Sequence, residues 1–272
     1  MERALATILD EARRGELIFP TNLAGAVRLQ QALNDPDCHL EDAAEMVVAE
    51  PLIAARLVAI AHSVAFTRFG GKISNVRAAL SLLGYNALKS LVAAIVVRQF
   101  SGAARGEKAA AMSSQLWRHC AHVGAQARVV ASRVARQDAD TAVFAGVVHE
   151  IAGFYLLSRS KDFPALVESS TAVDSDGYQQ LTQIVLGALK VPKTVADAVA
   201  THVPARREVP KTLGETLAIA NAMSPEPSPF AHLQPGLVVD AALDFAVGDS
   251  TLQVMVGEAA EDTATFAAEL IG

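Results

Sequence analysis

The sequence predicts an all-α protein, a helical bundle built in two parts. Hydrophobic residues fill 51% of the 272 positions, which is ample material for a core. They are mainly Ala, Val and Leu, with only 5% aromatic residues, and this composition suits close packing of helices better than a β-sheet. Apolar residues also recur three and four positions apart along most of the chain, and no segment keeps the alternation of a strand.

Residues 1–100 are predicted as the N-terminal helical sub-domain. Gly15 ends the first apolar stripe, and Asp35-Pro36 stops the second. Ser74 is placed to cap a later helix, which Gly84 ends. The expected helical segments are residues 5–15, 23–33, 52–64, 74–84 and 88–96.

Residues 101–114 are small and polar and show no apolar periodicity, so they are predicted to be a linker between the two parts. The second helical part is placed at 115–225, with a long helix from Leu116 to about Gln137 and a short apolar helix, Val143 to Ile151, closed by Gly153.

Turn-forming residues separate the later helices. The turns are expected at residues 174–177, at 204–210, where two prolines bracket Arg206 and Arg207, and at 224–229. Residues 226–272 are predicted as C-terminal helices, and the last of these, over 252–270, carries an apolar stripe. If exposed, that stripe is one place for homo-oligomerisation.

Charge and composition exclude several classes of protein. The formal net charge is −6, with Lys and Arg scattered among the acids, so no nucleic-acid partner is expected. The longest apolar run, 91–97, is far short of the roughly 20 residues of a membrane span, and no membrane partner is expected. Cys38 and Cys120 stand apart, without a disulfide or zinc pattern, and the N-terminus has no signal-peptide organisation. We therefore expect a cytoplasmic protein.

The histidines are the residues most suited to carry chemistry. His119 and His122 lie three apart and share a helix face, and His149-Glu150 ends an apolar helix. His202 follows an apolar stripe that could bring a third imidazole to the same cavity. The competing interpretation is that each is a buried histidine bonded to a backbone carbonyl, which is the commoner case. His39 is expected only to cap a helix or to lie at the surface. Nucleophile-elbow, P-loop and dinucleotide-binding motifs are all missing from the sequence.

Several stretches together resemble the HDOD family, a bacterial signalling family related to the HD phosphohydrolases. The likeness covers roughly residues 17–225, and the stretches that carry it are Ile18-Phe19-Pro20, 50–57, 61–66, 73–84, Leu116-Trp117-Arg118-His119, 144–153 and Val191-Pro192 leading to His202. The sequence departs from the family pattern with Glu50 for Asp, His62 for Asn and Leu23 for proline. This resemblance implies an HD-like helical sub-domain at 115–225.

The resemblance also brings in the catalytic HD enzymes, whose metal site is made by one early His, a His-Asp pair and a later Asp. This chain offers His119, His149-Glu150 and, in place of the later Asp, Asn221. A neutral amide supplies no negative charge to a hard cation. The lysine that often follows the His-Asp pair is also missing, and Phe154 stands in that region. The pocket formed by His119, His149, Glu150, His202 and Asn221 is thus expected to be a vestige of a metal site.

Three functions remain open at this point. The first is a non-catalytic regulatory HDOD module that contacts signalling proteins, such as kinases, receiver domains or cyclic-nucleotide enzymes, and needs no cofactor. The second is a metal-dependent phosphohydrolase or phosphodiesterase acting on a nucleotide, with a divalent metal held by His119, His149 and Glu150 and with His202 near the reacting oxygen. The third keeps the old cavity as a nucleotide sensor without chemistry.

Overall fold

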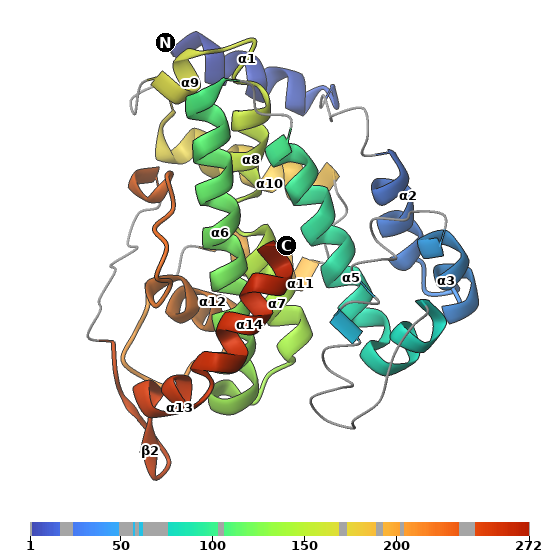
Figure 1. Ribbon diagram of the computed structural model, residues 1–272. Coiled ribbons are helices and arrows are strands. Elements are labelled where there is room, and N and C mark those ends of the chain that lie inside the picture. Colours follow the sequence, from blue (N-terminus) through green and yellow to red (C-terminus); the bar gives the residue numbers. More distant parts are fainter. Residues whose placement is uncertain are drawn as a thin grey trace. The chain divides into compact units, whose positions relative to one another are not determined.

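The computed structural model describes residues 2–16, 24–48, 57, 60–61, 76–102, 106–168, 173–188, 193–201, 204–233 and 243–271 (Figure 1). Two compact units make up the chain, and each is described by itself. One unit joins Met1–Pro20 to Val97–Gly272, and the other is Thr21–Val96.

The smaller unit contains helices α2 (Ala24–Leu33) and α3 (Leu40–Val48), together with the first part of α5 (Val76–Gly102). The Asp42 carboxylate accepts a hydrogen bond from the backbone N–H of His39 at 3.2 Å and so caps the start of α3. Gly84 interrupts α5 with a φ of 79°, a conformation open to glycine. The sequence prediction that one helix ends at Gly84 and another follows is therefore confirmed.

The larger unit is a bundle around one long helix, α6 (Glu107–Val129), which continues as a π-helical segment, η2 (Val130–Ala135). Helices α7, α8, α12 and α14 pack against α6, and α1 packs on α10 (Figure 1). The bounds of the other elements are α1 Glu2–Arg13, α7 Ala139–Val148, α8 Ile151–Ser158, α9 Ala165–Glu168, α10 Ser175–Ala188, α11 Lys193–Ala200, α12 Leu213–Ala222, η3 Ala231–Leu233, β1 Ala246–Val247, β2 Ser250–Thr251, α13 Leu252–Glu258 and α14 Ala260–Ile271. The predicted all-α fold is confirmed. In the part of the chain that the structure describes, the only sheet is the two-stranded hairpin of β1 and β2.

Two glycines let α6 and α7 approach closely. A Cβ atom on Gly146 would lie 2.6 Å from the Cα atom of Gly124, a distance that real side chains do not reach. The backbones of the two helices therefore touch at this point. The contact brings His149, at the end of α7, toward His119 on α6.

The predicted linker at 101–114 is wrong over most of its length. Helix α6 begins at Glu107, directly after Gly106 with its φ of 95°. Residues 109–111 are all alanine, the strongest helix former, so helix propensity outweighs the missing apolar periodicity. The N-terminal segment was also misplaced, because α1 belongs to the larger unit and its Leu5 packs against Gly177 of α10.

Two other predicted boundaries differ from the structure. The helix expected over Val143–Ile151 is two helices, α7 and α8, joined by a turn at His149-Glu150, and Gly153 lies inside α8. The turn expected at 174–177 is instead the start of α10, because the Asp174 carboxylate accepts the backbone N–H of Gly177 at 2.7 Å.

The first part of the C-terminal apolar stripe belongs to the core. The single helix predicted over 252–270 is two helices, α13 and α14. Of the predicted stripe, Leu252, Val256 and Ala259 are buried, Phe266 is partly buried, and the Leu270 side chain lies outside what the structure describes. The three buried residues pack on α6, η2 and α12. The first part of the stripe, at Leu252, Val256 and Ala259, therefore belongs to the core of the larger unit.

Thr141–Ser158, across α7 and α8, is the stretch of the described chain that is long and apolar enough to cross a membrane. It is 88% buried inside the structure, and the turn at His149-Glu150 divides it. These helices therefore have the burial of a protein core.

Candidate functional site

His119 projects from the middle of α6 and is 2% exposed. Its Nδ1 atom lies 2.6 Å from the backbone carbonyl oxygen of Glu226, so the Nδ1–H donates a hydrogen bond to that oxygen. The Ser224 hydroxyl donates to the same carbonyl at 3.0 Å. These contacts fix the orientation of the ring and leave its Nε2 atom pointing away from the 224–226 loop.

His149 is held in a matching way at the end of α7. Its Nδ1 atom lies 2.7 Å from the backbone carbonyl oxygen of Gly146, one helical turn earlier, and the residue is 7% exposed. A carbonyl oxygen only accepts, so this Nδ1 also carries the proton. Backbone carbonyls commonly select this tautomer in histidines that bind metal through Nε2.

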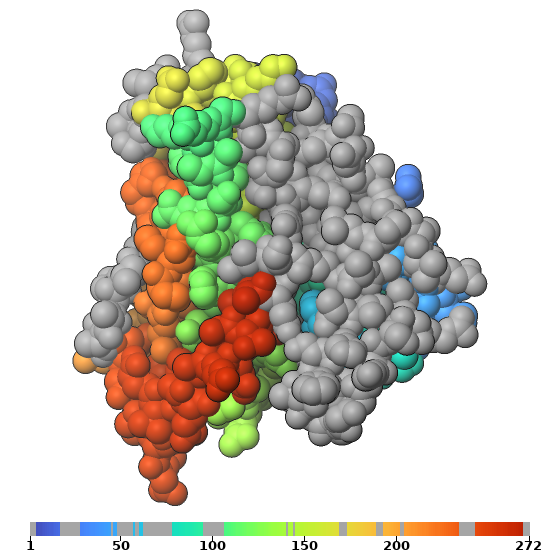
Figure 2. Space-filling view, viewed as in Figure 1, coloured from blue at the N-terminus to red at the C-terminus, as the bar shows by residue number. Residues whose placement is uncertain are grey.

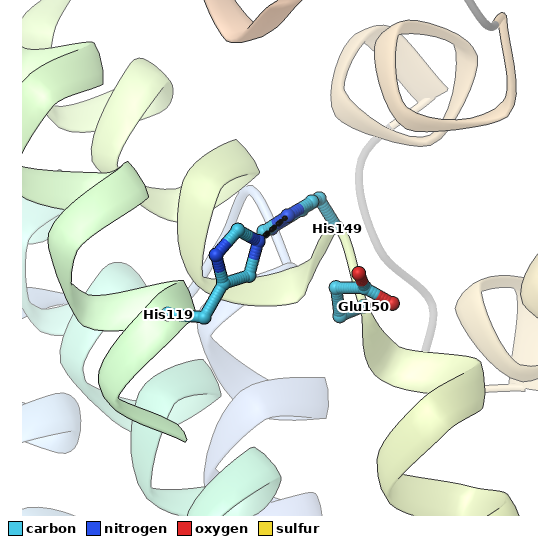
Figure 3. Close-up of side chains that lie close together, drawn as sticks. All are labelled: His119, His149 and Glu150. Atoms are coloured by element: carbon cyan, nitrogen blue, oxygen red, sulfur yellow. Dashed lines mark hydrogen bonds between the residues drawn. The ribbon is translucent and has the colours of Figure 1, made fainter. Parts of the chain in front are cut away.

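The two Nε2 atoms face one another at 3.1 Å (Figure 3). In the neutral rings both atoms carry lone pairs, and two lone pairs at this distance repel unless a proton or a cation lies between them. Two nitrogen ligands about 2.1 Å from one metal ion, at roughly a right angle, lie about 3.0 Å apart. The histidine pair thus has the spacing of two metal ligands, and it equally suits a shared proton.

Glu150 is next to His149 in sequence and is fully buried. One of its carboxylate oxygens and the histidine nitrogens all lie within 4.8 Å of one another, so the three residues form a possible metal-binding triad. Oxygen Oε2 accepts a hydrogen bond from the Tyr178 hydroxyl. In Figure 3 the carboxylate is turned away from the point where the two rings meet.

Cys120 and Tyr178 are wholly buried around this carboxylate. Burial raises the pKa of the Tyr178 hydroxyl well above its ordinary value, and the negative charge of Glu150 raises it further. The same two causes raise the pKa of the Cys120 thiol well above its ordinary value. Both groups therefore keep their protons at neutral pH, and Tyr178 is available as a donor to Glu150.

The other predicted site residues are placed differently. Asn221 is buried on α12, a helix that packs against both α6 and α7. His202 lies outside the residues that the structure describes. His122 is half-buried, and burial lowers its pKa, with smaller lowering by His119 and Arg118 against an opposing effect of Glu226. His39 is exposed.

A segment between α12 and η3 covers one side of the site. Arg118 on α6 forms an ion pair with Glu226 at 2.9 Å, and the Gln115 side chain donates to the Pro227 carbonyl at 2.9 Å. Phe230 stacks on the Tyr178 ring with a centroid separation of 5.7 Å. These contacts join the segment to α6 and α10.

The turn predicted at 224–229 is confirmed, but neither its contact with His119 nor the role of Tyr178 was predicted from the sequence. Tyr178 stands among the apolar positions of an amphipathic helix, so nothing in its spacing marks it as polar at its tip. Glu226 acts through its backbone carbonyl, and a backbone contact leaves no mark on residue type.

The hydrolytic metal centre implied by the family resemblance fits these residues only in part. The two imidazoles are suitable donors. Glu150 has one oxygen hydrogen-bonded by Tyr178, a contact that a metal-binding carboxylate can keep. Asn221, however, brings an uncharged amide where a second carboxylate would stand. The residues fit a two-histidine donor pair and do not fit the complete centre.

Comparisons with solved structures give the same fold. A candidate metal-dependent phosphohydrolase from Shewanella amazonensis SB2B superposes with a TM-score of 0.67 at 20% identity, covering 98% of each chain. An HDOD domain protein of unknown function from Geobacter sulfurreducens has a TM-score of 0.56 at 16% identity, again with 98% of each chain covered. A candidate signal transduction protein from Marinobacter aquaeolei VT8 has a TM-score of 0.54 at 18% identity, over 99% of this chain and 63% of that one.

A search among curated proteins found no match. The family model for the HDOD domain matches residues 19–202, which is more than half of the chain. The match takes in the first two helices of the smaller unit and both histidines of the pair. This protein therefore belongs to the HDOD domain family.

Proposed function

We propose that this chain is a regulatory HDOD module that acts in signal transduction by contacting other proteins and does not hydrolyse phosphoesters. The observation that carries the proposal is the hydrogen bond from Tyr178 to Glu150. It engages the one carboxylate of the possible triad. A hydrolase needs a firmly held metal ion that lowers the pKa of a bound water, and two neutral imidazoles are a poor basis for such a centre.

The burial of the triad supports the same proposal. His119, His149 and Glu150 are 2%, 7% and 0% exposed. Catalytic metal sites keep an open position for water or substrate. The 224–230 segment covers His119 on one side, and its ion pair to Arg118 and its stack on Tyr178 hold it there.

The second candidate is a metal-dependent phosphohydrolase or phosphodiesterase acting on a nucleotide. The 3.1 Å contact between the two Nε2 atoms favours it, because that spacing suits two ligands of one ion. The similar protein from Shewanella amazonensis, a candidate metal-dependent phosphohydrolase, also supports this candidate. The similar protein from Marinobacter aquaeolei, a candidate signal transduction protein, supports the first candidate.

The test combines an activity panel with partner capture. Purified protein would be assayed on nucleoside phosphates, cyclic dinucleotides and nitrophenyl phosphoesters, with Mg²⁺, Mn²⁺, Fe²⁺ or Zn²⁺ supplied. The proposal predicts no turnover above that of a His119→Ala variant, and reproducible capture of a signalling protein. Metal-dependent turnover that the variant lacks, with no partner captured, would overturn it.

A further inference from the structure

We propose that Tyr178 is a positioning residue that holds the Glu150 carboxylate away from His119 and His149, so that a metal ion entering the site meets only the two imidazoles. The inference concerns the same site as the proposed function and rests on it in taking the hydrolytic centre as incomplete. Beyond that function, Tyr178 is the group that keeps the centre incomplete, and His119 with His149 determines the class of ion that binds.

The hydrogen bond itself gives the first step. The Tyr178 hydroxyl donates to Oε2 of Glu150, and the two residues are 2% and 0% exposed. A bond from a neutral donor to a buried carboxylate is charge-assisted and stronger than an ordinary one. A buried carboxylate without such a partner is costly, so the bond to Tyr178 opposes movement of Glu150 toward the histidines.

Tyr178 is in turn fixed by its surroundings. Its ring stacks on Phe230 at an interplanar angle of 29°. A Cβ atom on Gly153 would lie 2.7 Å from the Phe230 ring, so Phe230 rests directly on the backbone of α8. The Asp174 carboxylate caps the first turn of α10, which carries Tyr178. The hydroxyl is therefore placed by packing and does not follow the carboxylate toward the histidines.

A competing interpretation gives Tyr178 the opposite role. Carboxylates that bind metals are themselves often hydrogen-bonded by a neighbouring residue, which strengthens metal binding. The first role is favoured by the view in Figure 3, where the carboxylate oxygens lie on the far side of the Glu150 side chain from the facing Nε2 atoms, although one of them is within 4.8 Å of the histidine nitrogens. The carboxylate lies beside Tyr178 and the buried Cys120 thiol. The two roles predict opposite effects of removing the hydroxyl.

The donor set decides which ions the pair accepts. Two neutral nitrogen atoms without a carboxylate suit Zn²⁺, Ni²⁺ or Cu²⁺, whereas Mg²⁺ and Mn²⁺ prefer oxygen ligands. We therefore expect the wild-type protein to bind Zn²⁺ weakly and Mn²⁺ more weakly still. Release of the carboxylate adds an anionic oxygen and improves the binding of Mn²⁺ most.

The test is a calorimetric titration of Zn²⁺ and Mn²⁺ into the wild-type chain and into Tyr178→Phe. Loss of the hydroxyl is expected to tighten Mn²⁺ binding about tenfold or more, the range over which such neighbouring groups change metal affinity. The matched control is Tyr85→Phe, which removes a hydroxyl that donates to the Cys38 carbonyl in the smaller unit, and it should leave both affinities unchanged. Unchanged or weaker Mn²⁺ binding in Tyr178→Phe would overturn the proposal.

A second variant covers the case in which Tyr178→Phe fails to fold. Glu150→Gln keeps the shape of the side chain and its acceptor oxygen for Tyr178 but removes the charge. If Glu150 is held out of the ligand set, the variant loses only the attraction between the carboxylate charge and the ion, so Zn²⁺ and Mn²⁺ binding weaken to a similar extent. A loss of Mn²⁺ affinity well beyond the loss of Zn²⁺ affinity would show that Glu150 is already a ligand. Either result is independent of turnover, so wild-type phosphoesterase activity would defeat the proposed function, whereas the titrations decide the role of Tyr178.

Discussion

His119 and His149 meet through their Nε2 atoms at 3.1 Å, and each ring is oriented by a backbone carbonyl on its Nδ1 side. The meeting depends on how closely α6 and α7 approach. That approach depends on two glycines whose backbones are in contact: Gly124 on α6, and Gly146 on α7, one turn before His149.

Gly146→Ala is expected to destabilise the larger unit and to separate the histidines. The new Cβ atom would lie 2.6 Å from the Gly124 Cα atom, and a backbone cannot move aside as a flexible side chain can. Overpacking of this kind costs about 1–3 kcal/mol. Urea unfolding followed by circular dichroism measures the change in the free energy of unfolding.

Gly187→Ala is the matched control for that experiment. Gly187 also lies in a helix, α10, and a Cβ atom there would meet no other atom within 4 Å. Because alanine is the better helix former, this variant should be as stable as the wild type or more stable by up to about 1 kcal/mol. Equal effects of the two substitutions would contradict the close helix contact.

Cys120 is expected to be inert toward Ellman's reagent in the folded protein. Its side chain is fully buried, and burial with the nearby Glu150 charge raises its pKa well above the ordinary value, so the reactive thiolate is not formed near pH 8. Cys38 is only partly buried. A Cys38→Ser variant should therefore show no rapid reaction until denaturant is added, and a fast reaction before denaturation would show that the site is open.

Glu215 makes the stability of α12 depend on acid pH. It forms a capping box with Thr212, and its carboxylate also accepts the backbone N–H of Lys211 at 2.7 Å. The bond from Lys211 is the largest cause that lowers the pKa of Glu215 below its ordinary 4.5. Because the folded-state pKa is the lower one, the stabilisation is complete above pH 4.5 and is lost as the pH falls through the folded-state value.

Glu215→Gln tests that dependence, since the amide oxygen can still accept both bonds but carries no charge. The wild type should exceed the variant in free energy of unfolding at pH 6, and the difference should shrink as the pH is lowered below 4.5. A difference that stays constant between pH 6 and pH 3 would mean that the ionised carboxylate contributes nothing to the cap.

The helical class and the pairing of His119 with His149-Glu150 could be predicted because both leave marks in residue type and spacing. Apolar periodicity is local, and the histidines recur in stretches that resemble the family. The break at Gly84 was equally readable, because glycine there allows a positive φ.

Other features had no such mark. Gly146 was not singled out, because close contact with Gly124 depends on a partner helix some twenty residues away. The C-terminal stripe at Leu252 and Val256 was correctly identified as apolar, but sequence alone does not say whether α6 and η2 cover it. The contact of Tyr178 with Glu150 joins α10 to the turn after α7, and no local pattern reports such a distant hydrogen bond.

The most direct measurement of the central claim is the rate of bis-(4-nitrophenyl) phosphate hydrolysis by the purified wild-type chain with saturating Mn²⁺, beside a His149→Ala variant of the same preparation. His149 supplies one of the two Nε2 donors, so the variant removes half of the histidine pair and serves as the background. A non-catalytic module predicts equal rates for the two proteins. A Mn²⁺-dependent rate in the wild type, well above that of His149→Ala, would contradict the account.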